Sequence, residues 1–226
     1  MIAPGYRVTV ALPTRNEAGG IAKVVEQVRP YADEILVVDG HSTDATRDLA
    51  AAAGARVVLD GGRGKGDGIR TALEQATGEV VVFFDADGSH EPHDIPNLLA
   101  PLSLGKADLV VASRALGGSD EFRMNFEHFL RQMGSDFATW IVNVRWRASL
   151  TDIQNGFRAG LRSRLLDLHL NANHFDVEEE MIMKALKKGL RVVEVPSHEY
   201  ERQWGRSKLA TSAGWRFLVR LAREMV

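Results

Sequence analysis

The chain has 226 residues, of which 45% are apolar, and a formal net charge of −2 at pH 7. This length predicts a single domain over residues 1–226, and the charge argues against a nucleic-acid-binding protein, which would carry a basic excess. Cysteine is absent, which excludes disulfides and thiolate zinc sites. The first seven residues lack the apolar core of a signal peptide, and no apolar run is long enough to span a bilayer, so we expect a cytoplasmic protein or a peripheral one at the cytoplasmic membrane face.

The first half of the chain alternates strand-like and helix-like patterns. Near-continuous apolar runs predict strands at residues 8–12, 34–39, 56–59, 80–84 and 108–113. Helical periodicity or helix-start signals mark residues 21–28, 42–53, 69–76 and 95–104, and a glycine-rich loop occupies residues 61–68. Apolar strands that alternate with helices predict an α/β fold with a mostly parallel central sheet flanked by helices.

The second half is less regular. We expect helices near residues 124–144, 162–168 and 177–188, a strand at 191–195 and a basic loop at 202–208. The last helix, within residues 211–226, is amphipathic. Its apolar face would carry Trp215, Leu218, Val219 and Ala222, and its basic face Arg216, Arg220 and Arg223. Such a helix either lies on an anionic membrane surface or packs on the protein with its charged face in water, and the sequence leaves both open.

Two acids, Asp85 and Asp87, follow the apolar run at residues 80–84. Alternate side chains of a strand share a face, so both carboxylates can converge on one point where the strand ends. Mg²⁺ and Mn²⁺ prefer carboxylate oxygens and commonly bridge to phosphates. Ligands of open parallel sheets bind outside the carboxyl ends of the strands, where Asp39 and Arg114 also fall. The alternative is that the two acids only cap the following turn.

Other ligand-binding signatures fail at identifiable positions. The first strand is followed by Pro13-Thr14-Arg15-Asn16-Glu17 and not by the glycine-rich turn of a dinucleotide-binding domain. Lys65 lies in a glycine-rich run that lacks the Ser or Thr of a P-loop. His90 and His93 do not have zinc-protease spacing, and we interpret both as solvated turn residues.

Taken in order, the polar motifs resemble those of family-2 glycosyltransferases of the GT-A fold. The first four are Leu12-Pro13-Thr14-Arg15-Asn16-Glu17, the segment Val37 to Thr46, Gly64-Lys65-Gly66 and Asp85-Ala86-Asp87. The later ones are Ser113-Arg114, the segment Thr151 to Arg158, Val193-Glu194-Val195-Pro196 and the segment Arg202 to Lys208. These later motifs narrow the resemblance to the dolichyl-phosphate mannosyltransferase-like branch, over about residues 8–210.

The resemblance implies a metal-dependent, inverting glycosyltransferase that uses a nucleoside-diphosphate sugar. Residues 8–113 would form a nucleotide-binding half and residues 114–210 an acceptor-binding half. Asp85 and Asp87 would hold Mg²⁺ or Mn²⁺, which would stabilise the charge of the departing diphosphate. The donor-binding residues implied are Pro13, Thr14, Asn16, Glu17, Asp39, Ser42, Lys65, Asp85 and Ala86. For Asn16 and Glu17, capping of the next helix is a second role open to them.

On the acceptor side, the catalytic residues implied are Asp87, Asp152 and Arg114. The residues expected around phosphate are Arg114, Arg131, Arg202, Ser207 and Lys208. Asp152 would act as a general base for an alcohol acceptor, or as a positioning group for a lipid phosphate that arrives ionised. Otherwise Asp152 only caps the turn at Asn155-Gly156. Glu178 or Glu180 would supply a further acid, and the sequence leaves the register of their helix open.

Three positions depart from the family pattern and leave the donor open, namely Arg15, Gly40 and Ser89. We expect GDP-mannose as the donor, with UDP-glucose or UDP-N-acetylglucosamine as alternatives. The expected acceptor is a polyprenyl or dolichyl phosphate. A soluble small-molecule acceptor, or a nucleotide-sugar-binding protein without activity, are the alternatives, and the sequence gives no oligomeric state.

Overall fold

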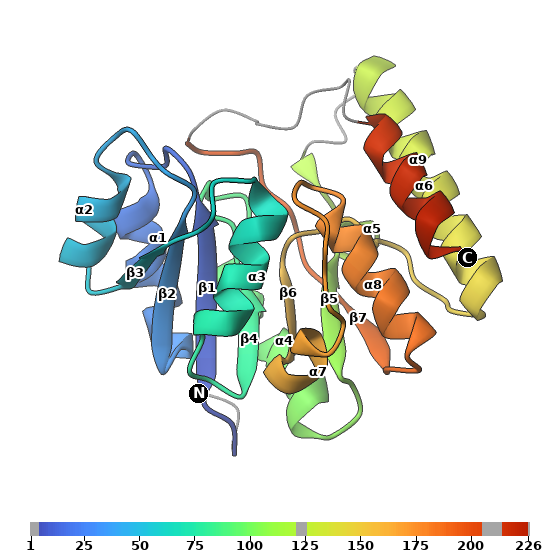
Figure 1. Cartoon of the computed structure of the whole chain (residues 1–226), viewed down its shortest axis with the longest axis horizontal. Coiled ribbons are helices and arrows are strands. Elements are labelled where there is room, and N and C mark those ends of the chain that lie inside the picture. Colours follow the sequence, from blue (N-terminus) through green and yellow to red (C-terminus); the bar gives the residue numbers. More distant parts are fainter. Residues whose placement is uncertain (1–4, 121–125, 205–213, 226) are drawn as a thin grey trace.

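The computed structural model describes residues 5–120, 126–204 and 214–225. These residues form one seven-stranded sheet in the order β3-β2-β1-β4-β6-β5-β7 (Figure 1). The strands are β1 (Val8–Thr14), β2 (Glu34–Asp39), β3 (Arg56–Leu59), β4 (Val80–Phe83), β5 (Leu109–Ser113), β6 (Arg158–Leu161) and β7 (Val192–Pro196). β6 is antiparallel to β4 and β5, and the other strand pairs are parallel. The predicted α/β fold with a mostly parallel sheet is confirmed.

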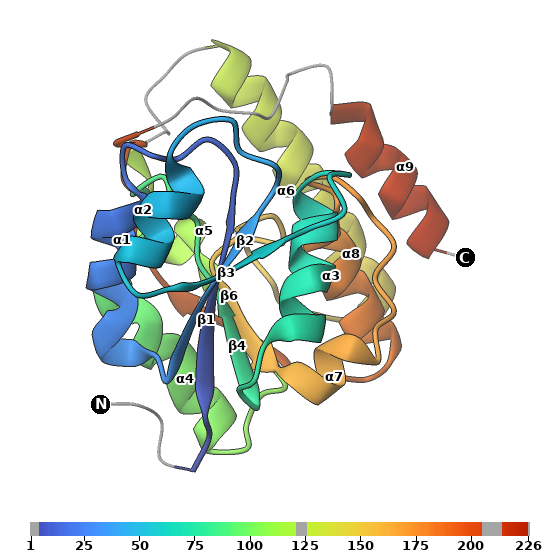
Figure 2. The same cartoon turned by 60° about the vertical axis from the view of Figure 1, so that its left-hand side comes forward.

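Helices cover both faces of this sheet. They are α1 (Ile21–Val28), α2 (Thr46–Ala52), α3 (Lys65–Gln75), α4 (Ile95–Ser103), α5 (Arg114–Gly117), α6 (Phe126–Trp146), α7 (Arg162–Leu166), α8 (Val177–Lys187) and α9 (Gly214–Glu224), with 3-10 turns at Arg29–Tyr31 and Pro92–Asp94. One apolar core lies between the sheet and α1, α2 and α4, and the other between the sheet and α3, α7 and α8 (Figure 2). α6 and α9 extend the second layer beyond α8.

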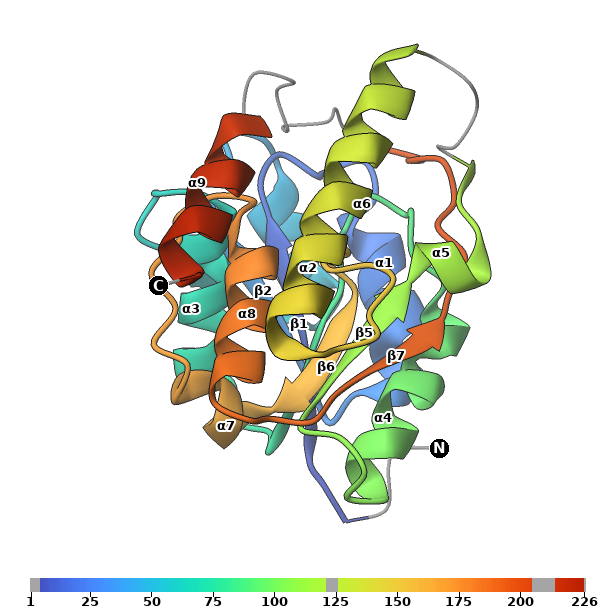
Figure 3. The ribbon, with the colours of Figure 1, turned by 90° about the vertical axis from the view of Figure 1, so that its right-hand side faces the viewer.

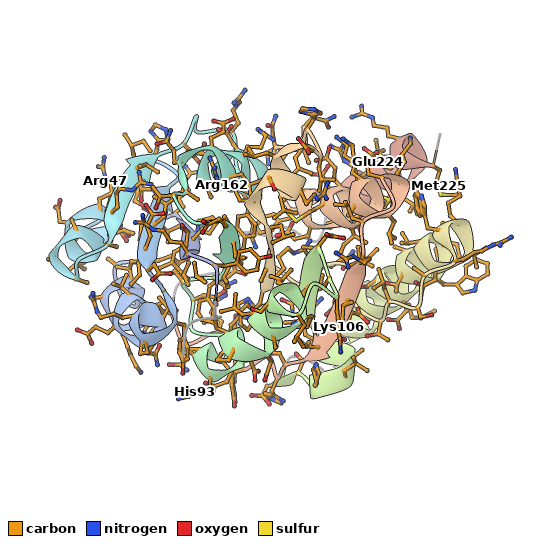
Figure 4. The ribbon with its side chains drawn as sticks, turned by 90° about the horizontal axis from the view of Figure 1, so that it is seen from below. Arg47, His93, Lys106, Arg162, Glu224 and Met225 are labelled. Atoms are coloured by element: carbon orange, nitrogen blue, oxygen red, sulfur yellow. The ribbon has the colours of Figure 1, made fainter. Side chains whose placement is uncertain are left out.

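Strand β6 is an element that periodicity did not predict. It is four residues long and begins at Arg158, whose side chain is fully buried. The Arg158 guanidinium donates to the carbonyl oxygens of Asn155 and Glu178, so its charge is placed among acceptors inside the protein. Arg162, just beyond the strand, donates to the Leu73 carbonyl at 2.7 Å and ties the end of α3 to this edge (Figure 4).

Helix α3 begins at Lys65, four residues before the predicted start, so part of the predicted glycine loop is helical. The glycines here allow two backbone segments to approach each other closely. A Cβ on Gly66 would lie 2.1 Å from the Ala172 carbonyl oxygen, much closer than real contacts allow. The first turn of α3 can therefore press directly on the backbone of Ala172 and Asn173, which fixes the position of Lys65.

The predicted faces of α9 are wrong at three of the four predicted positions that the structure describes, and right at Arg223, which is exposed. Arg220 is buried, and its Nε lies 2.9 Å from Asp176 Oδ2. Val219 and Ala222, predicted on the apolar face, are exposed. The acidic residues at the start of α8 attract the arginine inward, an effect that helical periodicity does not contain. The side chains of Trp215, Arg216 and Leu218 lie outside the described residues. No helix in the described ranges has the length and apolar character that a membrane span requires.

Glu34 joins three strands and α3 at the lower edge of the sheet. Its carboxylate accepts from Thr9 Oγ1 at 2.6 Å, the Thr77 backbone N–H at 2.8 Å and Arg56 Nε at 2.9 Å. Burial alone would raise the pKa of Glu34, but these donors outweigh it and lower the pKa to about 2.

The stability that Glu34 contributes should therefore depend on acidity. Because the folded-state pKa lies below the ordinary value of 4.5, this stability is complete above pH 4.5 and is lost as the pH falls towards 2. After allowance for solvent screening we expect about 1–2 kcal/mol. Urea unfolding of Glu34→Gln and wild type at pH 7 and pH 3 measures it. The assignment would be contradicted if the difference in unfolding free energy between the two proteins did not change with pH. It would also be contradicted if the exposed Glu26→Gln control showed the same change.

Candidate active site

The carboxyl ends of β1, β2, β3 and β4 surround a pocket of about 340 Å³. Its wall contains residues from the ends of these strands, from the start of α3, from the turn before α8 and from the segment after β7. The predicted site residues in the wall are Pro13, Thr14, Glu17, Lys65, Asp85, Ala86, Asp87 and Arg202. The structure therefore brings residues that are up to 189 positions apart in the sequence to one cavity.

Lys65 is held between two acids at the first position of α3. Its Nζ lies 3.0 Å from Asp85 Oδ1 and 2.9 Å from Glu178 Oε1. Burial alone would lower the pKa of Lys65, but the two carboxylates outweigh it and raise the pKa, so the ammonium stays charged. Glu178 thus contacts the wall residue Lys65 from behind, whereas Glu180 pairs with Arg220, which decides the register that the sequence left open.

Asp87 is buried beside the pocket and is paired with a residue that follows β7. Arg202 Nη2 lies 2.8 Å from Asp87 Oδ2, and Ser89 donates to Asp87 Oδ1 through its hydroxyl at 2.7 Å and its backbone N–H at 3.0 Å. The turn-capping alternative is therefore correct for Asp87, but it does not replace the pocket position, since one carboxylate does both.

The donor chemistry of Asp85 and Asp87 fits a hard divalent cation. Both carboxylates belong to the pocket wall, and Asp85 keeps 26% of its side chain exposed. Among the described residues no three acidic or histidine side chains form a metal-binding group. A cation here would therefore have two carboxylates from the protein, and phosphate and water oxygens would complete its shell, which is the usual arrangement for Mg²⁺.

The prediction that His90 is solvated is wrong, whereas the one for His93 is confirmed. His90 is buried, its ring stacks on Phe157 at 5.1 Å between centroids, and its Nε2 lies 3.4 Å from Asp85 Oδ2. Burial alone would lower the pKa of His90, but Asp85 outweighs it and raises the pKa. The contacts with Phe84 and Phe157, which bury the ring, cannot be predicted from the local sequence.

Three predicted donor-binding residues, Asn16, Asp39 and Ser42, lie behind the wall. Asp39 is fully buried, and both of its oxygens accept from Ser42, at 2.8 Å from the backbone N–H and 2.5 Å from the hydroxyl. Ser42 Oγ also accepts from the Asn16 N–H at 2.8 Å, and Asn16 has a positive φ of 54°. These residues fasten the loops after β1 and β2 to each other. The prediction that Asn16 or Glu17 caps α1 is wrong, because the N-cap is Gly20 and no side-chain capping hydrogen bond is formed there.

Some wall residues were missed by sequence reasoning. Asp60 follows β3 directly and accepts from the Gly62 N–H at 2.7 Å, and burial raises the pKa of its carboxyl. Its place after a parallel strand is the same signal that identified Asp85, and the adjoining glycines obscured it. His174 and Phe175 come from the turn before α8, where periodicity carries no information.

Arg114 and Asp152 form a bidentate ion pair outside the pocket wall. Arg114 Nε lies 2.6 Å from Asp152 Oδ2, and Nη2 lies 3.0 Å from Oδ1. Asp152 Oδ1 also accepts from the backbone N–H groups of Gln154 and Asn155, so Asp152 does cap this turn, but capping is not its sole contact. Burial would raise the pKa of Asp152, but Arg114 and these donors outweigh it and lower the pKa.

Comparison with known proteins places the chain. Residues 9–167 match the model of the family described as glycosyl transferase family 2. The chain belongs to glycosyl transferase family 2. This family-2 chain is 35% identical to glycosyltransferase AglJ of Haloferax volcanii over 88% of its own length, and it spans only 64% of that relative. It is 32% identical to undecaprenyl-phosphate mannosyltransferase of Micrococcus luteus, with 90% of the chain and 88% of the relative covered.

A solved structure confirms the fold of this family-2 chain. Glucosyl-3-phosphoglycerate synthase from Mycobacterium tuberculosis, in complex with Mn²⁺, uridine diphosphate and phosphoglyceric acid, superposes with a TM-score of 0.78 at 23% identity. The match covers 98% of this chain and 79% of that one. It supports the GT-A architecture predicted from the motifs.

Part of the predicted phosphate-binding set of this family-2 chain cannot be placed. Ser207 and Lys208 lie outside the described residues. Arg131 belongs to α6, but its side chain also lies outside them. Arg114 and Arg202 are placed: Arg114 Nη1 lies 3.5 Å from Glu199 Oε2, and Arg202 pairs with Asp87.

Trp204 closes the segment after β7 onto the loops of the site. It lies against two glycines: a Cβ on Gly20 would be 2.4 Å from its ring, and one on Gly88 would be 2.5 Å away. The Trp204 and Gln203 backbone N–H groups both bond the Asp87 carbonyl, at 3.3 and 3.0 Å. The indole thus packs between the start of α1 and the Asp87 turn, and this packing positions the neighbouring Arg202.

This contact should make the cost of a methyl group at Gly20 depend on Trp204. We expect Gly20→Ala to destabilise wild type by about 1–3 kcal/mol because the added carbon overpacks the ring. In a Trp204→Ala background most of that cost should disappear, since the indole is gone. Urea unfolding of the four proteins measures the coupling. Equal costs in both backgrounds would contradict it, and Gly134→Ala, which has nothing within 4 Å, is the control.

Proposed function

We propose that the chain transfers a hexose from a nucleoside-diphosphate sugar to a polyprenyl phosphate, with Mg²⁺ or Mn²⁺ and with inversion at the anomeric carbon. The observation that carries this proposal is the pairing of Asp85 and Asp87 with Lys65 and Arg202 in one pocket at the carboxyl edge of the sheet. A sugar diphosphate requires carboxylates that hold a divalent metal ion and basic side chains that bind its phosphates.

The donor diphosphate would lie between the two acids and the two cations. Bound to Asp85 and Asp87, the divalent cation would act as a Lewis acid and neutralise charge on the leaving diphosphate. Lys65 and Arg202 add fixed positive charge on the same wall. Pro13, Glu17 and Asp60 line the part of the pocket beyond the acids, and we assign the nucleoside to it.

The state of Asp152 supports an acceptor that is already ionised. Its pKa is lowered and both of its oxygens are engaged by Arg114 and backbone donors, which makes it a weak base. An alcohol acceptor would need a base near neutrality within reach, whereas a phosphate monoester needs none. We therefore assign Asp152 to the orientation of Arg114, and Arg114 to the acceptor phosphate.

The relatives support the lipid acceptor, and the donor base needs a direct test. The mannosyltransferase relative is named for undecaprenyl phosphate and aligns over most of its length. Together with the motif resemblance this favours GDP-mannose. The structural neighbour was solved with uridine diphosphate, so UDP-glucose and UDP-N-acetylglucosamine are the competing donors.

The test has two stages. A thermal-shift panel of GDP- and UDP-sugars with and without Mn²⁺ should give a rise in melting temperature for one base, larger with the metal, because a ligand bound only to the folded state stabilises it by mass action. Transfer from that donor is then assayed with undecaprenyl phosphate and with 3-phosphoglycerate. Transfer to the lipid phosphate alone supports the proposal. Transfer to the small acid alone overturns the acceptor, and metal-dependent binding without any transfer overturns the enzymatic role.

A further inference from the structure

Helix α6 exposes several large apolar side chains on its outer face. The residues it buries include the small side chain Ala138 and also Val142, and Ile141 and Trp146 are partly buried, whereas four large apolar side chains face outward. The exposed fractions are 53% for Met133, 54% for Phe137, 60% for Trp140 and 63% for Val144. Figure 3 shows α6 along the outer surface, with no other element in front of it. We call these four residues the α6 stripe. A contiguous apolar stripe of this kind marks an interaction surface.

The spacing within the α6 stripe points to another helix. The four residues follow at intervals of four, three and four, which is the alternation that keeps a seam of side chains facing a partner helix. The same intervals are obtained when the stripe is counted in the opposite direction. A stripe with this symmetry is complementary to itself in an antiparallel arrangement, as a twofold interface between identical chains requires.

We propose that the α6 stripe is the contact between two copies of this chain, which pair their α6 helices antiparallel about a twofold axis. Phe137 of each copy then packs on Trp140 of the other, and Met133 on Val144. Within one copy the Phe137 and Trp140 rings are already stacked, with centroids 6.0 Å apart. The two rings therefore form a preordered apolar ledge, so little side-chain freedom is lost on association.

The charges along α6 favour a protein partner over a lipid surface. A helix that lies on an anionic membrane carries lysine and arginine along its polar face. Between Met133 and Val144 the sequence contains neither, and it places the exposed acid Asp136 there. Basic residues occur only beyond the two ends of the stripe, with Arg131 before Met133 and Arg145 and Arg147 after Val144. This inference concerns the outer surface and does not depend on the proposed function.

Cysteine cross-linking tests both the contact and its direction, because the natural chain has no cysteine. We expect a disulfide when Met133→Cys and Val144→Cys proteins are mixed under mild oxidation, and little from either alone. In an antiparallel pair two copies of position 133 lie about 16 Å apart along the helix axis, beyond disulfide reach. Efficient cross-linking of Met133→Cys with itself, or none in the mixture, would overturn the proposal.

Light scattering gives the independent measurement. The wild type should approach twice the 24.9 kDa of one chain as concentration rises, and Phe137→Ser/Trp140→Ser should remain folded at that single mass, with a melting temperature that does not rise with protein concentration. Leu104→Ser, at a site 68% exposed in another part of the surface, is the matched control and should still dimerise. A monomeric wild type overturns the proposal. The proposal is also overturned if a monomeric wild type sediments with phosphatidylglycerol vesicles and the double variant does not. That result would assign the stripe to lipid binding.

Discussion

Replacement of Asp87 by asparagine is expected to lower metal-dependent sugar transfer by at least about 1,000-fold, or roughly 4 kcal/mol of transition-state stabilisation. The amide keeps the size of the side chain and one oxygen for the Ser89 donors. It removes the negative charge that would hold the cation, and it leaves Arg202 without its partner at 2.8 Å. The loss should therefore fall on turnover and metal dependence more than on folding.

Three measurements separate this effect from general damage. The melting temperature without ligand should stay close to that of wild type, the Mn²⁺-dependent part of the donor-induced shift should vanish, and kcat should collapse. Asp48→Asn, an exposed acid of α2, is the matched control and should behave as wild type. Undiminished transfer by Asp87→Asn would contradict the assignment of the metal site.

Removal of Arg114 is expected to destabilise the chain by about 3–5 kcal/mol, the largest stability effect that we predict. Asp152 is buried, and the Arg114 fork satisfies both of its oxygens at 2.6 and 3.0 Å. Arg114→Ala would leave that carboxylate charged and unpaired in the interior. Urea unfolding at pH 7 measures the cost.

Two further variants show whether the cost comes from the orphaned charge. Arg114→Ala/Asp152→Asn should recover part of the stability lost by Arg114→Ala, because the remaining group is neutral. Arg114→Lys should fall between wild type and alanine, since an ammonium keeps the charge but not the fork. A double variant no more stable than Arg114→Ala would mean that the loss reflects packing of the arginine stem and not the ion pair.

The apolar runs located the parallel strands well, both where the strand is buried, as Glu34–Asp39 is, and where it is partly exposed at the edge of the sheet, as Arg56–Leu59 is. Glu34–Asp39 and Arg56–Leu59 have the predicted bounds. The strand predicted at residues 191–195 is Val192–Pro196, so its bounds differ by one residue. β6 escaped because a four-residue strand that starts with a buried arginine carries no hydrophobic signal. It is defined by the strands on either side, and sequence periodicity does not contain that information.

The candidate site was predicted from the residues alone where the residue type and the strand end coincide, as for Asp85 and Asp87, whereas Lys65 came from the family resemblance. The predictions were wrong where tertiary partners decide the role. His90 is buried because its ring packs on Phe157. Arg220 points inward because it pairs with Asp176 and Glu180 at the start of α8. None of these pairs is close in the sequence.

The wall of the pocket is electrically balanced before anything binds. Its lysine, arginine, aspartate and glutamate side chains are the four bases Arg15, Arg63, Lys65 and Arg202 and the four acids Glu17, Asp60, Asp85 and Asp87. A sugar diphosphate brings two negative charges and a divalent cation two positive ones, so together they preserve neutrality, whereas either alone would leave a charged cavity. The two should therefore strengthen each other's binding, and the affinity for the complete pair should change little with ionic strength.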